Sequence, residues 1–160
     1  MSEGVERVAR LMALLFYHLA SEVERSFGEE GLEAIRRGVE NFGLERGRAI
    51  RQKVEEMGLE PNLENLSRHY DMPLKEAWRA RRLELSPDRS SSEVDFCPFA
   101  QVWLEKGRPD LGLIYCSQDE ALHRGYNPEI SFENPKNVLR GDPCCALKAS
   151  IPDGSEGRSS

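Results

Sequence analysis

The hydrophobic period of this chain changes partway along it, and that change constrains the fold more than any other feature. Up to about residue 57, apolar residues recur three and four positions apart, which is typical of amphipathic helices. From residue 78 onward, short alternating runs separated by turn residues are typical of strands. Helices followed by strands predict an α+β fold, with long N-terminal helices packed on one face of a small antiparallel sheet.

Two long helices are predicted in the N-terminal part. The first covers residues 3–27 and ends at Gly28, because glycine tolerates the left-handed conformation that follows many helices. The second continues to about residue 57. Inside it, Gly43 and Gly47 lie one turn apart, where they permit the close approach of another element, a kink or a ligand-facing groove. The predicted buried stripes are Val5, Val8, Met12, Leu15, Leu19 and Val23 in the first helix, and Leu32, Ile35, Val39, Phe42, Ile50, Val54 and Met57 in the second.

The elements that follow are short. Helices are predicted at 63–70, 74–77, 99–106 and 119–123, and strands at 78–85, 94–97, 111–116, 130–133 and 144–151, with Ser90 to Ser92 in a loop. Residues 1–151 are expected to form a single domain. The tail at 152–160 contains glycine, serine and charged residues, and we expect it to be disordered.

Composition narrows the class of protein. The 160 residues carry a net charge of -6 with both signs mixed, which is typical of a globular protein and argues against a nucleic-acid footprint. The longest apolar stretch, from Leu11 to Ala20, is interrupted by His18 and is too short to cross a bilayer. We therefore expect a cytoplasmic protein with no membrane partner, in which cysteines stay reduced.

The four cysteines, at 97, 116, 144 and 145, allow three interpretations. They fill a core as small apolar side chains, or they bind zinc with His123 or Asp119, or Cys116 acts as a nucleophile beside these two residues. No Cys-x-x-Cys pair supports the zinc site. If Cys144 and Cys145 lie on a strand, they point to opposite faces, so at most one of them reaches a shared site.

The order of short motifs in this half resembles that of the L-2-amino-thiazoline-4-carboxylic acid hydrolase family. The motifs are Phe96-Cys97-Pro98, Cys116-Ser117-Gln118-Asp119, Tyr126-Asn127-Pro128 and Gly141-Asp142-Pro143-Cys144-Cys145. The resemblance covers about residues 8–151. It implies a hydrolase that adds water to the thiazoline carbon between sulfur and nitrogen, and opens the ring to give N-carbamoyl-cysteine.

The resemblance also suggests roles for individual residues. Asp119 would be the base that activates water, Cys116 an alternative nucleophile, and His123 a proton relay. Asp142 would orient or protonate the substrate, and Arg140 would hold its carboxylate. Two further substrate-binding candidates are Tyr126 and Asn127. Purely structural roles compete with these: a helix N-cap for Asp119, a turn for Asp142 and a surface position for Arg140.

In architecture, the chain resembles the ligand-binding domains related to the 4-vinyl reductase and vesicle-tethering TRAPP families. That resemblance implies an alternative function, a non-catalytic small-molecule binding or sensor domain that contains zinc. Its metal ligands would be Cys97, Cys116 and Cys145. No cofactor other than zinc is suggested. The long helical half also predicts a homodimer interface.

Overall fold

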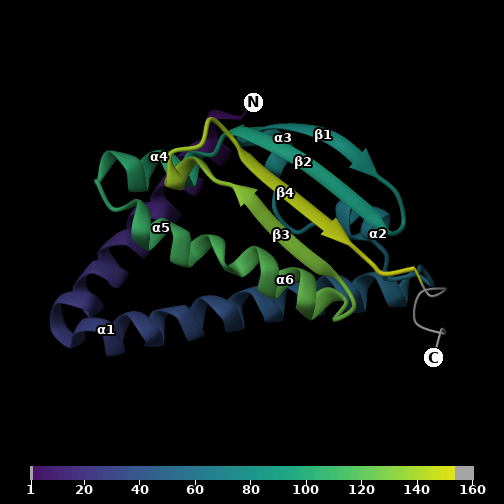
Figure 1. Cartoon of the computed structure of the whole chain (residues 1–160), viewed down its shortest axis with the longest axis horizontal. Coiled ribbons are helices and arrows are strands. Elements are labelled where there is room, and N and C mark those ends of the chain that lie inside the picture. Colours follow the sequence, from purple (N-terminus) through teal and green to yellow (C-terminus); the bar gives the residue numbers. More distant parts are fainter. Residues whose placement is uncertain (1, 154–160) are drawn as a thin grey trace.

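The structure, a computed structural model, describes residues 2–153. Its dominant element is helix α1 (Glu3–Glu56), which bends sharply at Gly28 (φ 63°, ψ -144°), so that its two halves form a V (Figure 1). This positive φ is the conformation that glycine accepts without a steric penalty. The predicted break between two helices is therefore confirmed.

The first half of α1 buries a different face from the predicted one. Small residues face the core, with Ala9, Ala13 and Ala20 almost completely buried. Their size lets α4 (Pro98–Glu105) approach closely, and Trp103 Nε1 donates a hydrogen bond to the Ala13 carbonyl at 3.0 Å. The predicted stripe is wrong for its central members, because Val8, Met12, Leu15 and Leu19 are 46–60% exposed. The helical period was thus predicted correctly, and its phase was not.

The second half of α1 packs directly against α6 (Gln118–Tyr126). A Cβ atom added at Gly43 or Gly47 would clash with backbone atoms of α6, and one added at Gly125 would clash with the backbone of Leu44. Of the three alternatives for the paired glycines, close approach is therefore correct. Leu32, Val39, Ile50 and Val54 are buried as predicted, whereas Phe42 and Met57 are exposed.

The sheet has four antiparallel strands in the order β1-β2-β4-β3. Their bounds are β1 (Arg79–Leu85), β2 (Arg89–Phe96), β3 (Ser131–Lys136) and β4 (Cys145–Ser150). The loop predicted at Ser90 to Ser92 is wrong, because these serines pair with both β1 and β4 inside the sheet. Sheet pairing outweighs the weak strand propensity of serine here.

Two short helices, α2 (Leu63–Arg68) and α3 (Leu74–Ala77), connect α1 to the sheet, as predicted. The strand predicted at 111–116 is wrong, because these residues belong to helix α5 (Pro109–Cys116). Pro109 at its first turn favours a helix start, and Gly112 gives room for the Trp103 ring. A short apolar run does not distinguish a buried strand from a buried helix by its period.

The layers follow from these contacts. In Figure 1, α6 lies between the second half of α1 and the sheet, while α4 and α5 lie beside the first half of α1. The chain is therefore α+β, as predicted, with its helices on one face of the sheet. No helix among residues 2–153 combines the length and apolar character needed to cross a membrane. Most of the tail predicted at 152–160 lies outside the described residues.

Candidate functional site

Asp119 lies where α5 ends and α6 begins. The Cys-x-x-Asp motif spans this junction, with Cys116 as the last residue of α5 and Asp119 as the second residue of α6. The N-cap position belongs to Ser117, so the capping role considered for Asp119 is wrong. Instead, the Asp119 carboxylate accepts a hydrogen bond from Gln118 Nε2 at 2.7 Å.

The surroundings of Asp119 make its carboxyl a weak acid. Burial raises its pKa to about 6, although the Arg46 guanidinium and the hydrogen bond from Gln118 act in the opposite direction. The side chain is half-buried and keeps part of its surface accessible. A carboxyl with a pKa near neutrality is suited to accept and return a proton during a reaction.

Arg46 is the cation of this site. It projects from the second half of α1, is 9% exposed, and binds both carboxylate oxygens of Asp71 at 2.6 and 2.8 Å. Its remaining terminal nitrogen donates to Gln118 Oε1. The guanidinium carbon lies 5.2 Å from the centre of the Phe42 ring and 5.6 Å from that of Tyr70. A continuous polar chain thus runs from Asp71 through Arg46 and Gln118 to Asp119.

Two tyrosines complete the polar surroundings. Burial raises the pKa of Tyr70, and the charge of Asp119 raises it further. Burial also raises the pKa of Tyr115, whose hydroxyl is buried without a hydrogen-bond partner among the described residues. Both hydroxyls are therefore protonated near neutral pH. Within residues 2–153 the hydroxyl of Tyr115 is an unpartnered donor, and the charges of Arg46 and Asp119 both act on it.

Three of the four thiols face the same region. Burial raises the pKa of Cys97 to about 11, and burial together with the Asp119 charge raises the pKa of Cys116 and of Cys145. Cys145 Sγ accepts a hydrogen bond from Val138 N at 3.4 Å. Of the adjacent pair, Cys145 is therefore the thiol that lies on the Asp119 side.

In the part of the chain from residue 2 to 153, no group of three or more His, Cys, Asp or Glu side chains has an arrangement that could hold a metal ion. Cys97, Cys116 and Cys145 are close enough to influence one another electrostatically, but they do not form such a group. The zinc alternative stays a prediction without a ligand set in the described residues.

His123 lies one turn after Asp119 on α6. Its Nδ1 lies 2.7 Å from the backbone oxygen of Asp119, so this nitrogen carries the proton and donates it. The ring stacks on Phe132 with 4.4 Å between ring centres, and burial lowers its pKa. This neutral imidazole contacts the backbone of Asp119, and no recorded hydrogen bond links it to the carboxylate.

The other predicted residues organise loops. Asp142 Oδ2 accepts a hydrogen bond from the backbone N–H of Asn137 at 2.8 Å. Asn137 is buried and lies beside Cys116, so Asp142 is connected to the site through it. Arg140, in the 3-10 helix η1 (Val138–Arg140), is exposed and donates to the Asn134 carbonyl.

Tyr126 and Asn127 lie at the far end of α6, about two turns from Asp119. The Tyr126 hydroxyl donates to the Asn62 carbonyl at 2.7 Å, and Asn127 Nδ2 donates to the Pro61 carbonyl at 3.0 Å. Both side chains tie α6 to the turn before α2. The structure does not bring them to the Asp119 site.

The sequence contained a signal for Arg46. Gly43, Arg46, Gly47 and Ile50 follow the three- and four-residue spacing of a buried helix face, so a charged residue interrupts an otherwise apolar or small stripe. Charges are rarely buried without a partner, and such a position indicates a polar site. Gln118 and Tyr70 had no comparable signal, because the contacts of both with Arg46 join residues that are distant in sequence.

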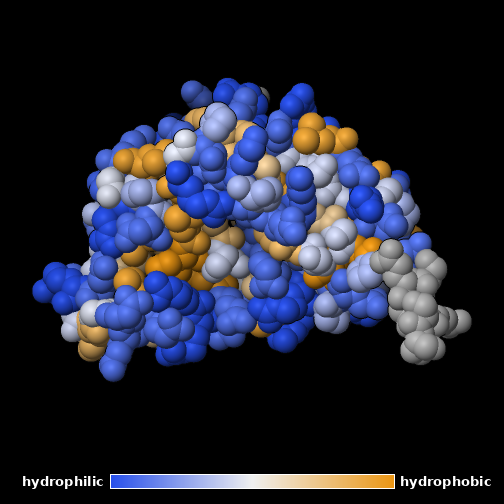
Figure 2. All heavy atoms as spheres, in the orientation of Figure 1, coloured by the Kyte–Doolittle hydropathy of each residue, from blue (hydrophilic) through white to orange (hydrophobic). Residues whose placement is uncertain are grey.

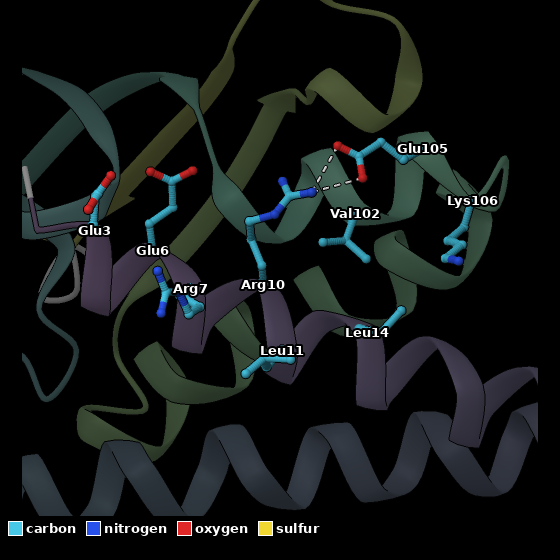
Figure 3. Close-up of a pocket in the computed structure, with 9 residues that line it drawn as sticks. All are labelled: Glu3, Glu6, Arg7, Arg10, Leu11, Leu14, Val102, Glu105 and Lys106. Carbon is cyan, nitrogen blue, oxygen red and sulfur yellow. Dashed lines mark hydrogen bonds and ion pairs between the residues drawn. The ribbon is translucent and has the colours of Figure 1, made fainter.

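A separate cleft of about 570 Å³ lies between the first half of α1 and α4 (Figure 3). Its walls carry charges of both signs, and Arg10 donates to both oxygens of Glu105 across it at 2.9 and 3.0 Å. No residue of the Asp119 site lines this cleft. Figure 2 shows instead a recess over α5 in which apolar atoms gather between charged surfaces.

The protein is thus an α+β protein with a polar site between α1 and the α5–α6 junction. The site contains the half-buried carboxyl of Asp119 and the buried guanidinium of Arg46. A family model described as L-2-amino-thiazoline-4-carboxylic acid hydrolase matches residues 8–148, and the chain belongs to that family. No curated protein matches it significantly.

A solved structure has a similar fold. It is a trafficking protein particle complex subunit 3 from Naegleria fowleri, described as covalently bound to palmitic acid. The match has a TM-score of 0.57 and 18% sequence identity, and it covers 91% of this chain and 95% of that one. The predicted likeness to TRAPP-type domains is therefore confirmed at the level of the fold.

Proposed function

We propose that this chain hydrolyses a small cyclic amidine such as L-2-amino-thiazoline-4-carboxylate. Water adds to the ring carbon between sulfur and nitrogen and gives a tetrahedral intermediate. One proton of the water passes to the ring nitrogen. The bond from that carbon to sulfur then breaks as the added hydroxyl becomes a carbonyl, and the hydroxyl proton passes to the sulfur, so that one water is consumed and N-carbamoyl-cysteine is formed. The family membership supports the reaction class, and the site supports the roles below.

Asp119 is the proposed general base. Its ionised carboxylate takes a proton from the attacking water and passes it to the ring nitrogen, and it then carries the hydroxyl proton of the intermediate to the departing sulfur. The pKa of about 6 suits both steps, because the group is largely ionised near neutrality and is a stronger proton donor than the thiol it must protonate. This raised pKa on a half-buried carboxyl is the observation that carries the proposal.

Cys116 is better suited to a neutral role than to nucleophilic attack. A cysteine nucleophile reacts as its thiolate, and the raised pKa of Cys116 keeps the thiol protonated. We therefore assign the attack to water. The hydrogen bonds described above give His123 a role in fixing the backbone at Asp119, and Asp142 a role in fixing Asn137 beside the thiol.

The test is turnover of the thiazoline acid by the wild type and by Asp119→Asn and Cys116→Ala. Asp119→Asn should reduce kcat by about 10²–10⁴-fold, the usual contribution of general base catalysis, and Cys116→Ala should retain most activity. Glu120→Gln is the matched control, because Glu120 is the next residue, exposed and paired with Arg124. Full turnover by Asp119→Asn would exclude this site assignment. Stoichiometric zinc with no turnover would instead favour a sensor.

A second candidate function is non-catalytic binding of an apolar small molecule. An apolar groove of about 270 Å³ lies between the start of α1 and the α2–α4 region, with Met72, Trp78 and Phe99 in its wall. Cys97 packs in the same hydrophobic cluster. The palmitic acid in the similar solved structure suggests a fatty acid as the probe. Saturable palmitate binding that Met72→Glu abolishes, without thiazoline turnover, would favour this function.

We also propose that residues 2–151 form a single domain, and that this domain forms a homodimer through α1. Val8, Met12, Leu15 and Leu19 alternate at four- and three-residue spacing on α1 and are 46–60% exposed. Val8 and Met12 also line the apolar groove, so a second copy and a fatty acid are alternative occupants at that end of the stripe. The spacing of these four residues is that of a helix-pairing seam. A second copy supplies the partner helix through a two-fold axis.

A further inference from the structure

Arg46 has the properties of a carboxylate-binding group. Its planar fork is saturated by two parallel hydrogen bonds to one carboxylate, that of Asp71, at 2.6 and 2.8 Å. The rings of Phe42 and Tyr70 lie within 6 Å of the guanidinium carbon. Burial opposes its charge, but Asp71 raises the pKa of Arg46 overall. A fixed fork of this kind recognises any carboxylate that reaches it in the plane.

The carboxylate that fills the fork comes from a residue whose own backbone N–H makes no hydrogen bond within residues 2–153. Asp71 lies between α2 and α3, and its side chain is 37% exposed against 9% for Arg46. Within residues 2–153, the backbone N–H groups of Tyr70, Asp71 and Met72 donate no recorded hydrogen bond, and Pro73 has no N–H to donate. The contact with Arg46 is therefore the polar anchor of the Asp71 side chain. Tyr70 and Met72 on either side pack in hydrophobic clusters, so the movement that the structure permits at low cost is that of the Asp71 side chain, which breaks no backbone hydrogen bond.

We propose that Arg46 is the receptor for the ligand's carboxylate, and that Asp71 occupies this receptor when no ligand is bound. A ligand carboxylate would displace Asp71 from the fork, and Asp71 would move into solvent. The exchange replaces one charge-assisted pair with an equivalent one, so Arg46 is never left buried and unpaired. The identity of the ligand as a thiazoline acid rests on the proposed function.

The position of the fork relates this exchange to the reaction. Arg46 contacts Gln118, and Gln118 contacts the Asp119 carboxylate, so a ligand held by Arg46 would be one side chain away from the proposed base. A ring without a carboxylate has no group that competes with Asp71. The site would therefore select carboxylate-bearing rings by displacement. Arg140, the residue that the sequence suggested for this role, lies exposed on the Asn134 carbonyl.

The experiment measures binding in an Asp119→Asn background, where turnover is suppressed. Calorimetry compares L-2-amino-thiazoline-4-carboxylate with 2-amino-thiazoline, which lacks the carboxylate. Adding Asp71→Asn removes the competing charge and should increase the affinity for the carboxylate ligand about fivefold, the upper end of the scale for a partly exposed ion pair. It should leave the neutral ring unchanged. Asp95→Asn, which breaks the exposed pair with Arg79, is the control and should change neither affinity.

Arg46→Lys provides a second arm that does not depend on Asp71. It keeps the positive charge but loses the planar pair of donors. It should therefore lower the affinity for the carboxylate ligand about tenfold and leave the affinity for the neutral ring unchanged. Equal affinity with and without Asp71→Asn, equal tightening of both ligands, or no binding of the carboxylate at all would overturn the proposal. If Asp71→Asn increases the affinity for the carboxylate ligand alone and the wild type shows no turnover, the role of Arg46 as carboxylate receptor is supported and hydrolysis is rejected. If the wild type turns over the thiazoline acid and Asp71→Asn changes no affinity, hydrolysis is supported and the receptor role of Arg46 is rejected.

Discussion

Gln118 holds the Asp119 carboxylate at 2.7 Å and at the same time accepts a hydrogen bond from Arg46, so one amide connects the carboxyl to the buried cation. The amide group is fixed in one orientation by these two contacts, because its oxygen must face Arg46 and its nitrogen must face Asp119. The protonation of Asp119 is therefore coupled to the state of the arginine fork.

The first prediction concerns the pH dependence of the proposed reaction. The base must be ionised, so kcat/KM should rise tenfold per pH unit below about pH 6 and level off above it. Gln118→Leu removes a hydrogen bond that lowers the pKa of Asp119, so the acid limb should move to higher pH. Initial rates between pH 4.5 and 8.5 measure both effects. An acid limb that stays in place in Gln118→Leu would contradict the assignment of this limb to Asp119.

The second prediction concerns stability. Burial raises the pKa of Asp119 from 3.8 to about 6 in the folded protein, so ionisation opposes folding. Both states are protonated below about pH 3.8, the penalty develops between there and about pH 6, and it is complete above. Asp119→Asn removes it and should raise the free energy of unfolding at pH 8 by up to about 3 kcal/mol. Urea titrations should show no such gain at pH 3.5.

The fold was largely predictable because the hydrophobic periods of its helices and strands are clear in the sequence. The predictions that were wrong have specific causes. Gly28 and the helix-to-strand change identified the architecture. The phase of the first helix was wrong because the contact with Trp103 favours Ala13 over larger apolar residues, a tertiary requirement with no local signature. In the same way, the Cys-x-x-Asp motif located Asp119, whereas its environment depends on Arg46, which is 73 positions away in the printed sequence.

The third prediction tests the packing of α1 on α6. Gly47→Ala places a Cβ against the backbone of α6 at Leu122 and Tyr126, neither of which is a flexible side-chain end. Such overpacking should destabilise the protein by about 1–3 kcal/mol. Gly38→Ala is the matched control, because it lies in the same helix with nothing within 4 Å of its added Cβ. It should stabilise the helix by about 0.5–1 kcal/mol. Equal changes in Tm for both variants would argue against the close approach.

The fourth prediction tests the pairing of two copies through α1. Leu15 is 60% exposed at the middle of the stripe formed by Val8, Met12, Leu15 and Leu19. In a dimer this side chain would be buried, so Leu15→Glu would place a charge opposite its own copy across the two-fold axis. It should convert a dimer into a monomer with an unchanged helix content and Tm at low protein concentration. Leu104→Glu is the control, because Leu104 is 42% exposed on α4, away from the stripe. Sedimentation velocity over a range of concentrations distinguishes the two states. A wild type that is already monomeric at the highest concentration would reject the interface, and loss of the dimer in both variants would indicate a non-specific effect of the added charge.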